Sequence, residues 1–285
     1  MDIVYLNGQF IAADQAKISV FDRGFLFSDS VYEVIPFYAG EGFQLEQHIK
    51  RLKISLAALN ISVEDNYTEI VQELVAKNKM TNCSVYLQVT RGADTKRRHS
   101  INESLKPTVF ACINPIVNNY ALAAAEVSGI NVIVCEDLRW KRCDIKSTSL
   151  LPNILVIEQA RQQGAKEALL INDGKVLEGA SSNLFLVESN KIITPPSSHA
   201  ILNGTTSQLV QQVARKQKIA VLHEDISYQR LIAADEVWIT SSTRGLLPVL
   251  KVDDKFIAGG EKGAVWQKLY VLLAQAQAKL LNETD

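Results

Sequence analysis

The stretch EGASSNLF at residues 178–185 places a glutamate, small residues and two serines directly before an apolar run. A β-hairpin precedes it, because Asp173-Gly174 suits a tight turn between expected strands at 168–171 and 175–177. Further strands are expected at 184–187 and 192–194, followed by a helix at 206–216. The stretch therefore belongs to a strand-rich region in which its polar residues stand at strand ends.

Farther from this stretch, strands and helices mix without strict alternation. The apolar patterns predict strands at 4–6, 9–11, 84–90, 108–113, 130–135 and 236–240, and helices at 45–59, 68–77, 153–163 and 261–281. Such a mixture favours an α+β fold over a doubly wound parallel sheet. The alanine-containing segment 118–126 is the expected linker, which gives domains at 1–120 and 121–285.

Composition excludes several classes of function. The net charge of -1 offers no field for nucleic acid or an anionic membrane. No segment approaches the roughly 20 apolar residues that cross a bilayer, and the N-terminus does not resemble a signal peptide. The four cysteines show no CxxC spacing and the four histidines no close pairing, so neither a metal site nor a disulfide framework is predicted. A cytoplasmic location is expected.

Three other polar segments accompany the first, namely RWKRCDIKS at 139–147, ILNGTT at 201–206 and TSST at 240–243. Taken alone, Lys146 reads as a solvated lysine and Glu178 as an exposed residue at a strand end. In order and spacing, however, the four segments together resemble the class IV pyridoxal-phosphate aminotransferases. The resemblance runs from about Val4 to about Trp266. Within the family, RWKRCDIKS is most similar to the D-amino-acid (D-alanine) aminotransferases.

The resemblance implies two catalytic residues, Lys146 and Glu178. Lys146 would form a Schiff base with pyridoxal 5'-phosphate and, once released, carry a proton to and from the substrate, which requires a neutral amine. Glu178 would face the pyridine nitrogen and keep it protonated, so that the ring accepts electrons.

A phosphate site is also expected, because the GTT of ILNGTT stands at a predicted helix start, where free backbone N–H groups favour an anion. For Thr206, simple helix capping is an equally good reading, and for Arg51 a solvated position is the alternative. The cofactor-binding residues that the family pattern implies, besides Lys146 and Glu178, are Arg51, Leu202, Gly204, Thr205, Thr206, Ser241 and Ser242.

The basic loop at residues 91–99 reads by itself as a solvated run. The resemblance implies instead that Tyr32, Arg97 and His99 bind the substrate α-carboxylate, the last two reaching a neighbouring subunit. The loop is one residue longer than the family spacing, so Arg98 is an alternative to Arg97. Two further departures are SDS at 28–30 in place of Gly-Asp-Gly, and Thr205 and Ser207 where an aliphatic residue and arginine are common.

The resemblance thus implies a two-domain fold-type IV enzyme, with an N-terminal α+β domain, a C-terminal pseudo-barrel, the cofactor between them, and a homodimer. Its reaction would convert D-alanine and 2-oxoglutarate to pyruvate and D-glutamate. Branched-chain L-amino-acid aminotransferases and aminodeoxychorismate lyases share the same machinery and remain alternatives. A non-catalytic cofactor-binding protein is a further alternative, against which the presence of both Lys146 and Glu178 argues.

Overall fold

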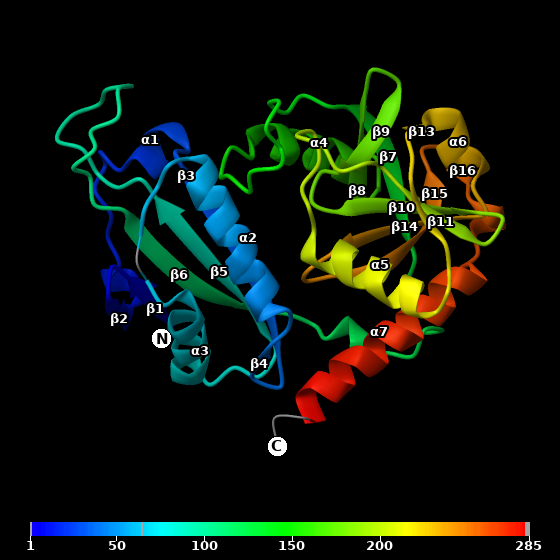
Figure 1. Ribbon diagram of the computed structural model, residues 1–285, viewed down its shortest axis with the longest axis horizontal. Coiled ribbons are helices and arrows are strands. Elements are labelled where there is room, and N and C mark those ends of the chain that lie inside the picture. The colour runs from blue at the N-terminus through cyan, green and yellow to red at the C-terminus, as the bar shows by residue number, and fades with distance from the viewer. Residues whose placement is uncertain (1, 64, 283–285) are drawn as a thin grey trace. The chain divides into compact units, whose positions relative to one another are not determined.

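The computed structural model describes residues 2–63 and 65–282, and the chain divides into two compact units (Figure 1). Unit 1 comprises Met1–Val117 and Ile145–Ser149, and unit 2 comprises Asn118–Asp144 and Leu150–Asp285. The division therefore falls three residues before the expected boundary at Tyr120. The short segment Ile145–Ser149, expected in the second domain, packs with unit 1 instead.

Unit 1 is built on one antiparallel sheet in the order β2-β1-β6-β5-β3-β4. Its strands are β1 (Ile3–Leu6), β2 (Gln9–Ala12), β3 (Ser30–Tyr38), β4 (Glu41–Gly42), β5 (Cys83–Thr90) and β6 (Thr108–Pro115). The hairpin between β1 and β2 is confirmed, because Asn7 and Gly8 both take positive φ angles, 48° and 90°.

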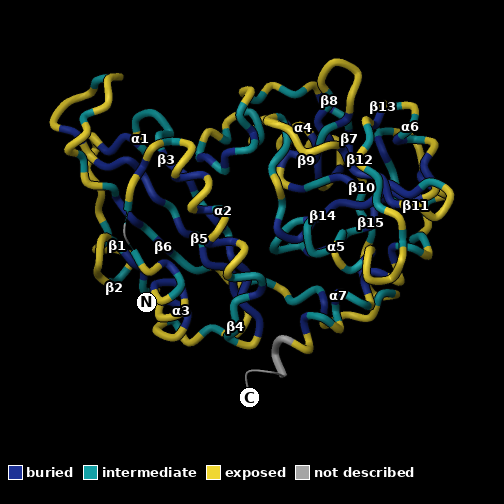
Figure 2. Tube along the Cα trace, in the orientation of Figure 1, coloured by how far each residue is buried: buried dark blue, intermediate teal, exposed yellow. Residues whose placement is uncertain are grey.

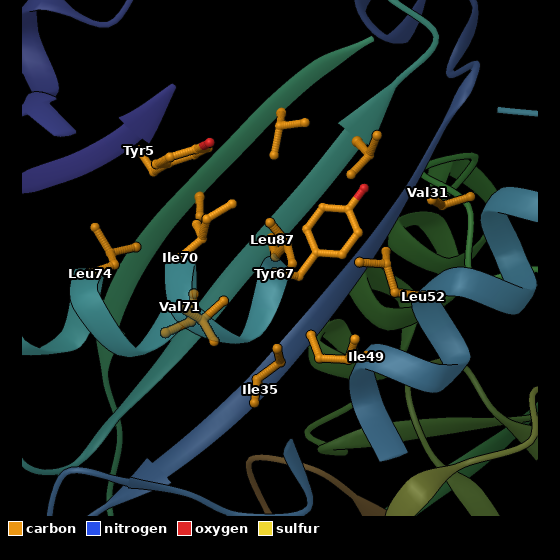
Figure 3. Packing of buried hydrophobic residues seen from close by; sticks show 14 of the residues in the cluster. Tyr5, Val31, Ile35, Ile49, Leu52, Tyr67, Ile70, Val71, Leu74 and Leu87 are labelled. Carbon is orange, nitrogen blue, oxygen red and sulfur yellow. The ribbon is translucent and has the colours of Figure 1, made fainter. Parts of the chain in front are cut away.

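Two amphipathic helices, α2 (Leu45–Ala58) and α3 (Tyr67–Asn78), pack on this sheet and confirm the expected helices. Figure 3 shows Ile49 and Leu52 of α2, and Ile70 and Leu74 of α3, pointing toward the strands. Full burial of such a side chain stabilises the fold by roughly 1.5–3 kcal/mol. The short elements of unit 1 are η1 (Ala13–Gln15) and α1 (Arg23–Phe27).

Strand β3 was not predicted from the sequence, although it carries Tyr32 and Glu33. Pro36 lies inside it, and a proline argues against a central strand because it lacks an N–H group. In the structure β3 pairs along its length with β5, but β4 covers only Phe37 and Tyr38 on the other side. Pro36 is tolerated because β4 pairs only with Phe37 and Tyr38, so no strand needs an N–H group from Pro36 on the side away from β5.

Unit 2 contains a mixed sheet in the order β12-β11-β10-β14-β15-β7-β8-β9-β13, with β16 beside β15. The sheet curls so that β9 returns to β10 at the Gly179–Ser182 bridge. The strands are β7 (Ile130–Glu136), β8 (Glu167–Asn172), β9 (Lys175–Gly179), β10 (Asn183–Glu188), β11 (Lys191–Thr194), β12 (Val221–His223), β13 (Ile226–Ser227), β14 (Glu236–Ser241), β15 (Gly245–Val252) and β16 (Lys255–Phe256).

The inner face of the curled strands forms an apolar core, to which Val132, Leu169, Val176, Leu184, Ile239 and Val249 contribute from six strands. Because side chains alternate along a strand, Trp238 and Thr240 face the other side of β14 from Ile239. The pseudo-barrel expected for this part of the chain stays a prediction. In both units the buried part of the trace follows the strands and the exposed part follows the turns (Figure 2).

The helices of unit 2 pack against its sheet. They are α4 (Leu151–Gln162), α5 (Thr205–Lys216), α6 (Tyr228–Ala233) and α7 (Ala264–Asn282), with short 3-10 turns η2 (Asn119–Ala121) and η3 (Ala258–Gly260). α4 packs on β7 and β8, whereas α5 and α7 both pack on β14. Among residues 2–63 and 65–282, no helix combines the length and apolar composition needed to cross a membrane.

Candidate active site

Lys146 lies in the short segment that joins unit 1. Its neighbour Ile145 is buried in the core of that unit. The Lys146 backbone N–H donates to Ser55 Oγ (3.2 Å), and its carbonyl accepts from the Tyr32 N–H (3.0 Å). The Lys146 amine then lies 4.2 Å from the centre of the Tyr32 ring. Two residues predicted from the sequence, Lys146 and Tyr32, are therefore side by side.

A hydroxyl contact fixes the same segment to the start of β3. Ser30 Oγ and Thr148 Oγ1 lie 2.5 Å apart, and Ser147 forms a β-bridge with Val31. Ser28, at the first position of SDS, adopts the left-handed conformation with φ 54°. That conformation suits glycine, so Ser28 carries a backbone strain that the usual family residue would not.

Next to Tyr32, Glu33 forms a buried cluster with Arg51 and His48. Arg51 donates from Nε and Nη2 to the two carboxylate oxygens of Glu33 (2.7 and 2.8 Å), and His48 Nδ1 lies 2.7 Å from Oε2. Burial by itself would raise the pKa of Glu33, but Arg51 and His48 together hold it well below its usual range. Burial also lowers the pKa of His48, outweighing the opposing effect of Glu33.

Arg51 was expected from the family resemblance as a phosphate ligand, whereas Glu33 and His48 were not predicted to belong to the site. In the structure Arg51 binds the buried carboxylate of Glu33, so it does not occupy the solvated position that was the alternative interpretation. One sequence feature was available, because His48 and Arg51 are three residues apart and so share a face of their helix. The partner Glu33 lies on the strand that was not predicted.

The loop at residues 91–99 distinguishes Arg97 from Arg98. Arg98 donates to both carboxylate oxygens of Asp94 (2.6 and 2.7 Å). Arg97 forms no ion pair with any residue that the structure describes, and its guanidinium lies 5.1 Å from the centre of the Phe27 ring. The His99 ring lies 5.4 Å from the same Phe27 ring. Arg97 and His99 thus lie on the same ring, that of Phe27. Of the two arginines, Arg97 rather than Arg98 has a guanidinium available for a ligand.

Arg23 holds this loop in place. Its Nη1 donates to the Arg98 carbonyl (2.8 Å) and its Nη2 to the His99 carbonyl (3.3 Å). Its Nε donates to Asp29, the middle residue of SDS, to which Arg91 also binds with two nitrogens. Burial alone would raise the pKa of Asp29, but Arg91 and Arg23 lower it. Asp29 therefore holds the start of the basic loop through Arg91, whereas Lys96, Arg97 and His99 are exposed, as expected for a solvated run.

In unit 2, Glu178 is buried and receives several donors. Arg139 Nη1 donates to Oε1 (2.6 Å), Asn183 Nδ2 donates to Oε2 (3.1 Å), and the Leu202 N–H is shared by both oxygens (3.2 Å each). Arg139 also binds both oxygens of Asp137 (2.9 Å each). Burial raises the pKa of Glu178 to about 7, although Arg139 acts in the opposite direction. Glu178 is therefore not the exposed residue at a strand end that was the alternative interpretation. The backbone N–H of Leu202 binds the Glu178 carboxylate.

The start of α5 in unit 2 has the features of an anion site. Its N-cap Gly204 provides no side-chain hydrogen bond, so the first N–H groups of the helix are not capped by that residue. A Cβ atom at Gly204 would lie 1.9 Å from Asn183 Oδ1, so any larger residue would require Asn183 to move. Thr205 Oγ1 and Ser242 Oγ are 3.5 Å apart. The buried Thr240 Oγ1, one residue before Ser241, has no hydrogen-bond partner in the described chain.

Comparison with known proteins relates these features to a family. The family described as amino-transferase class IV matches residues 30–252. The matched segment contains Tyr32, Arg51, Arg97, Lys146, Glu178 and the start of α5. The chain belongs to the class IV aminotransferases.

Named relatives extend over nearly the whole length of this aminotransferase. It is 36% identical to the D-alanine aminotransferase of Bacillus licheniformis over 99% of this chain and 98% of the relative. It is 34% identical to that of Staphylococcus epidermidis over 94% and 95%. Among solved structures, the branched-chain aminotransferase from Thermoproteus uzoniensis with norvaline is similar at 25% identity and TM-score 0.83, with 96% and 93% covered. The branched-chain amino acid aminotransferase from Thermobaculum terrenum in its PLP form shares the fold at 22% identity and TM-score 0.85, with 96% and 93% covered.

As a member of this family, the enzyme is a pyridoxal-phosphate-dependent transaminase with the two-domain fold-type IV α+β architecture. The residues of unit 2 fit such a group. Two features suit its phosphate. The start of α5 has a glycine N-cap, at which a larger residue would displace Asn183, and the buried Thr240 hydroxyl has no hydrogen-bond partner in the described chain. A buried glutamate with a pKa of about 7 suits a positive ring nitrogen, because an adjacent cation favours the ionised carboxylate.

Proposed function

We propose that this aminotransferase exchanges amino groups between D-amino acids and 2-oxo acids, converting D-alanine and 2-oxoglutarate to pyruvate and D-glutamate. The observation that carries the proposal is the similarity to D-alanine aminotransferases at 34–36% identity over nearly the whole chain. The free guanidinium of Arg97 beside His99 supports it, because a planar fork suits a substrate carboxylate.

Each proposed residue has a defined task. When bound, the cofactor supplies a ring that accepts the electrons left at the substrate Cα. Lys146 would hold the cofactor covalently until the substrate amine displaces it, and its released Nζ would then take the proton from the substrate Cα and deliver it to C4′ of the cofactor. The Glu178 carboxylate holds the charged ring nitrogen.

The remaining residues of the proposal bind and orient. Tyr32, Arg97 and His99 bind the α-carboxylate of the substrate. Arg51, Leu202, Gly204, Thr205, Thr206, Ser241 and Ser242 form the surroundings of the cofactor, most of them on the phosphate side. For Arg51 this role would be combined with its bond to Glu33.

We also propose a cytoplasmic homodimer without nucleic-acid or membrane partners. The net charge of -1 supports the absence of nucleic-acid and membrane partners. The homodimer is supported by an apolar surface on α4, where Leu151, Ile154 and Leu155 are each more than half exposed (67%, 59% and 56%) and could contact a second copy. Light scattering of the purified protein at several concentrations tests the dimer, and a monomer at all concentrations would contradict it.

The reaction is tested by mixing purified holoenzyme separately with D-alanine, L-leucine and aminodeoxychorismate. D-alanine should bleach the absorbance of the lysine-bound cofactor and release pyruvate. Branched-chain L-transamination is the second candidate, because the similar solved structures named above are branched-chain aminotransferases. A response to L-leucine but not to D-alanine would favour that candidate, and pyruvate together with 4-aminobenzoate from aminodeoxychorismate would indicate a lyase.

The role of Lys146 has its own test. Lys146→Ala should abolish the visible absorbance of the lysine-bound cofactor and reduce transamination to background, because no other amine among the described residues of unit 1 holds the same place beside Tyr32. Lys141→Ala, at an exposed lysine five residues earlier, is the matched control and should retain both. Normal colour in Lys146→Ala would refute the assignment.

A further inference from the structure

Arg244 connects two turns of unit 2 that carry proposed cofactor ligands. It ends the turn after Ser241 and Ser242, between β14 and β15. Its Nε donates to Ser241 Oγ (3.2 Å) and its Nη2 to Ser181 Oγ (2.9 Å). Ser181 lies three residues after Glu178, in the turn that leads from β9 to β10. The guanidinium is therefore positioned beside both halves of the site in unit 2.

Glu167 fixes the orientation of this guanidinium. Its carboxylate is buried and binds Arg244 Nη2. The same carboxylate accepts from Ser181 Oγ (2.8 Å), Ser182 Oγ (3.1 Å) and the Ala168 N–H (3.1 Å). With so many donors around it, the negative charge of Glu167 is well stabilised on the buried side of the arginine.

One nitrogen of the Arg244 guanidinium, Nη1, is not used by the described part of the protein. An arginine has five N–H donors, and here Nε and Nη2 bind the partners named above. Among the described residues none accepts a hydrogen bond from Nη1, and the Arg244 side chain is 29% exposed. Ser181 beside it is exposed as well. Two charge-assisted donors are thus oriented by a buried carboxylate and open to a small ligand.

We propose that Arg244 binds the side-chain carboxylate of five-carbon dicarboxylic substrates, D-glutamate and 2-oxoglutarate, and so favours them over substrates with one carboxylate. The inference rests on the proposed function, because D-glutamate and 2-oxoglutarate carry a second carboxylate that takes no part in the amino-group exchange. The unused Nη1 of the guanidinium matches a carboxylate in charge and can donate a charge-assisted hydrogen bond to one of its oxygens.

The test measures selectivity rather than activity. In Arg244→Met, the ratio of kcat/KM for D-glutamate to kcat/KM for D-alanine should fall roughly tenfold to hundredfold, as expected for a lost hydrogen bond between charged groups. The same fall is expected for 2-oxoglutarate relative to pyruvate. Arg161→Met, which removes an exposed arginine paired with Glu158 on α4, is the control and should not change either ratio. An unchanged ratio in Arg244→Met, including a parallel loss for both substrates, would overturn the inference.

A second variant covers the case in which Arg244→Met fails to fold because Glu167 has lost its arginine. Glu167→Gln combined with Arg244→Met removes both charges and should show the same fall in selectivity. Binding of glutarate and butyrate to the holoenzyme, followed by calorimetry, gives a readout without turnover. The preference for glutarate should disappear in either variant, and its persistence would overturn the inference. If wild type instead transaminates only L-leucine, the proposed function fails, while the glutarate preference still decides the role of Arg244.

Discussion

Glu33 in unit 1 and Glu178 in unit 2 are both buried carboxylates that bind an arginine at short distance, 2.7 and 2.6 Å. Their pKa values nevertheless move in opposite directions. The pKa of Glu33 is well below its usual range, whereas burial raises that of Glu178 to about 7. The difference follows from how each arginine is shared.

Arg51 gives its two-nitrogen fork to Glu33, and His48 adds a third contact. Arg139 gives its fork to Asp137 and only Nη1 to Glu178, and the charge of Asp137 further raises the pKa of Glu178. Glu33 is therefore a permanently ionised part of the structure. Glu178 needs a further positive charge to be fully ionised, which is the charge that a protonated ring nitrogen brings.

The largest effect is expected from breaking the Glu33 cluster. Glu33→Gln should reduce the free energy of unfolding of the apoprotein at pH 7.5 by about 3–5 kcal/mol, because it removes the carboxylate that balances the largely buried charge of Arg51. Urea unfolding followed by circular dichroism measures this. Glu73→Gln, which removes an exposed pair with Lys77, is the control and should change it by less than about 1 kcal/mol.

The pH dependence of the Glu33 effect has a definite sign. A carboxylate whose folded pKa is lowered stabilises the protein above the unfolded pKa of about 4.3 and loses this contribution as pH falls toward the folded value. The difference between wild type and Glu33→Gln should therefore be greatest above about pH 5 and shrink in more acidic solution. A constant difference from pH 7 to pH 3 would contradict the ionised assignment.

An intermediate effect is expected from making the Glu178 cluster resemble that of Glu33. Asp137→Asn removes the competing charge, so Arg139 should favour ionised Glu178 and lower its pKa below about 7. A shift of about one unit corresponds to ~1.4 kcal/mol. Infrared titration of the apoprotein carboxyl band, assigned with Glu178→Gln, measures it. Asp225→Asn, at an exposed partner of Lys175, should leave the titration in place; an unchanged pKa in Asp137→Asn would show that Asp137 has no such influence.

The smallest effect is expected from His48→Gln, which leaves the Glu33–Arg51 fork intact. The loss should be about 1 kcal/mol, the value of one hydrogen bond, in urea unfolding at pH 7.5. Because burial lowers the pKa of His48, the unfolded chain binds its proton more readily, and wild type loses stability as pH falls below about 6.5. That part of the pH dependence should be absent in His48→Gln. A loss as large as that of Glu33→Gln would indicate that His48, not Arg51, dominates the cluster.

Much of the fold follows local rules and was predicted for that reason. The Asn7-Gly8 turn requires positive φ angles, and the apolar spacing of 45–59 needs only the helical period. Strand β3 was not predicted because it contains Pro36, and proline is accepted in a strand only where no neighbouring strand needs its N–H group. Which neighbours a strand has cannot be read from the residues of that strand alone. The same reason explains why Glu33 was missed while Arg51 was found.

The sequence by itself determined the family and the mixed α+β class, since these depend on residue types in a linear order, and the same order led to Lys146 and Glu178 as the proposed catalytic residues. Tertiary structure alone decided that Ile145–Ser149 packs with unit 1, that Arg98 rather than Arg97 pairs with Asp94, and that Glu33 and Glu178 differ in pKa. The ionisation of a buried carboxylate depends on how many donors reach it and on what else those donors bind. Both are properties of contacts between residues far apart in the chain.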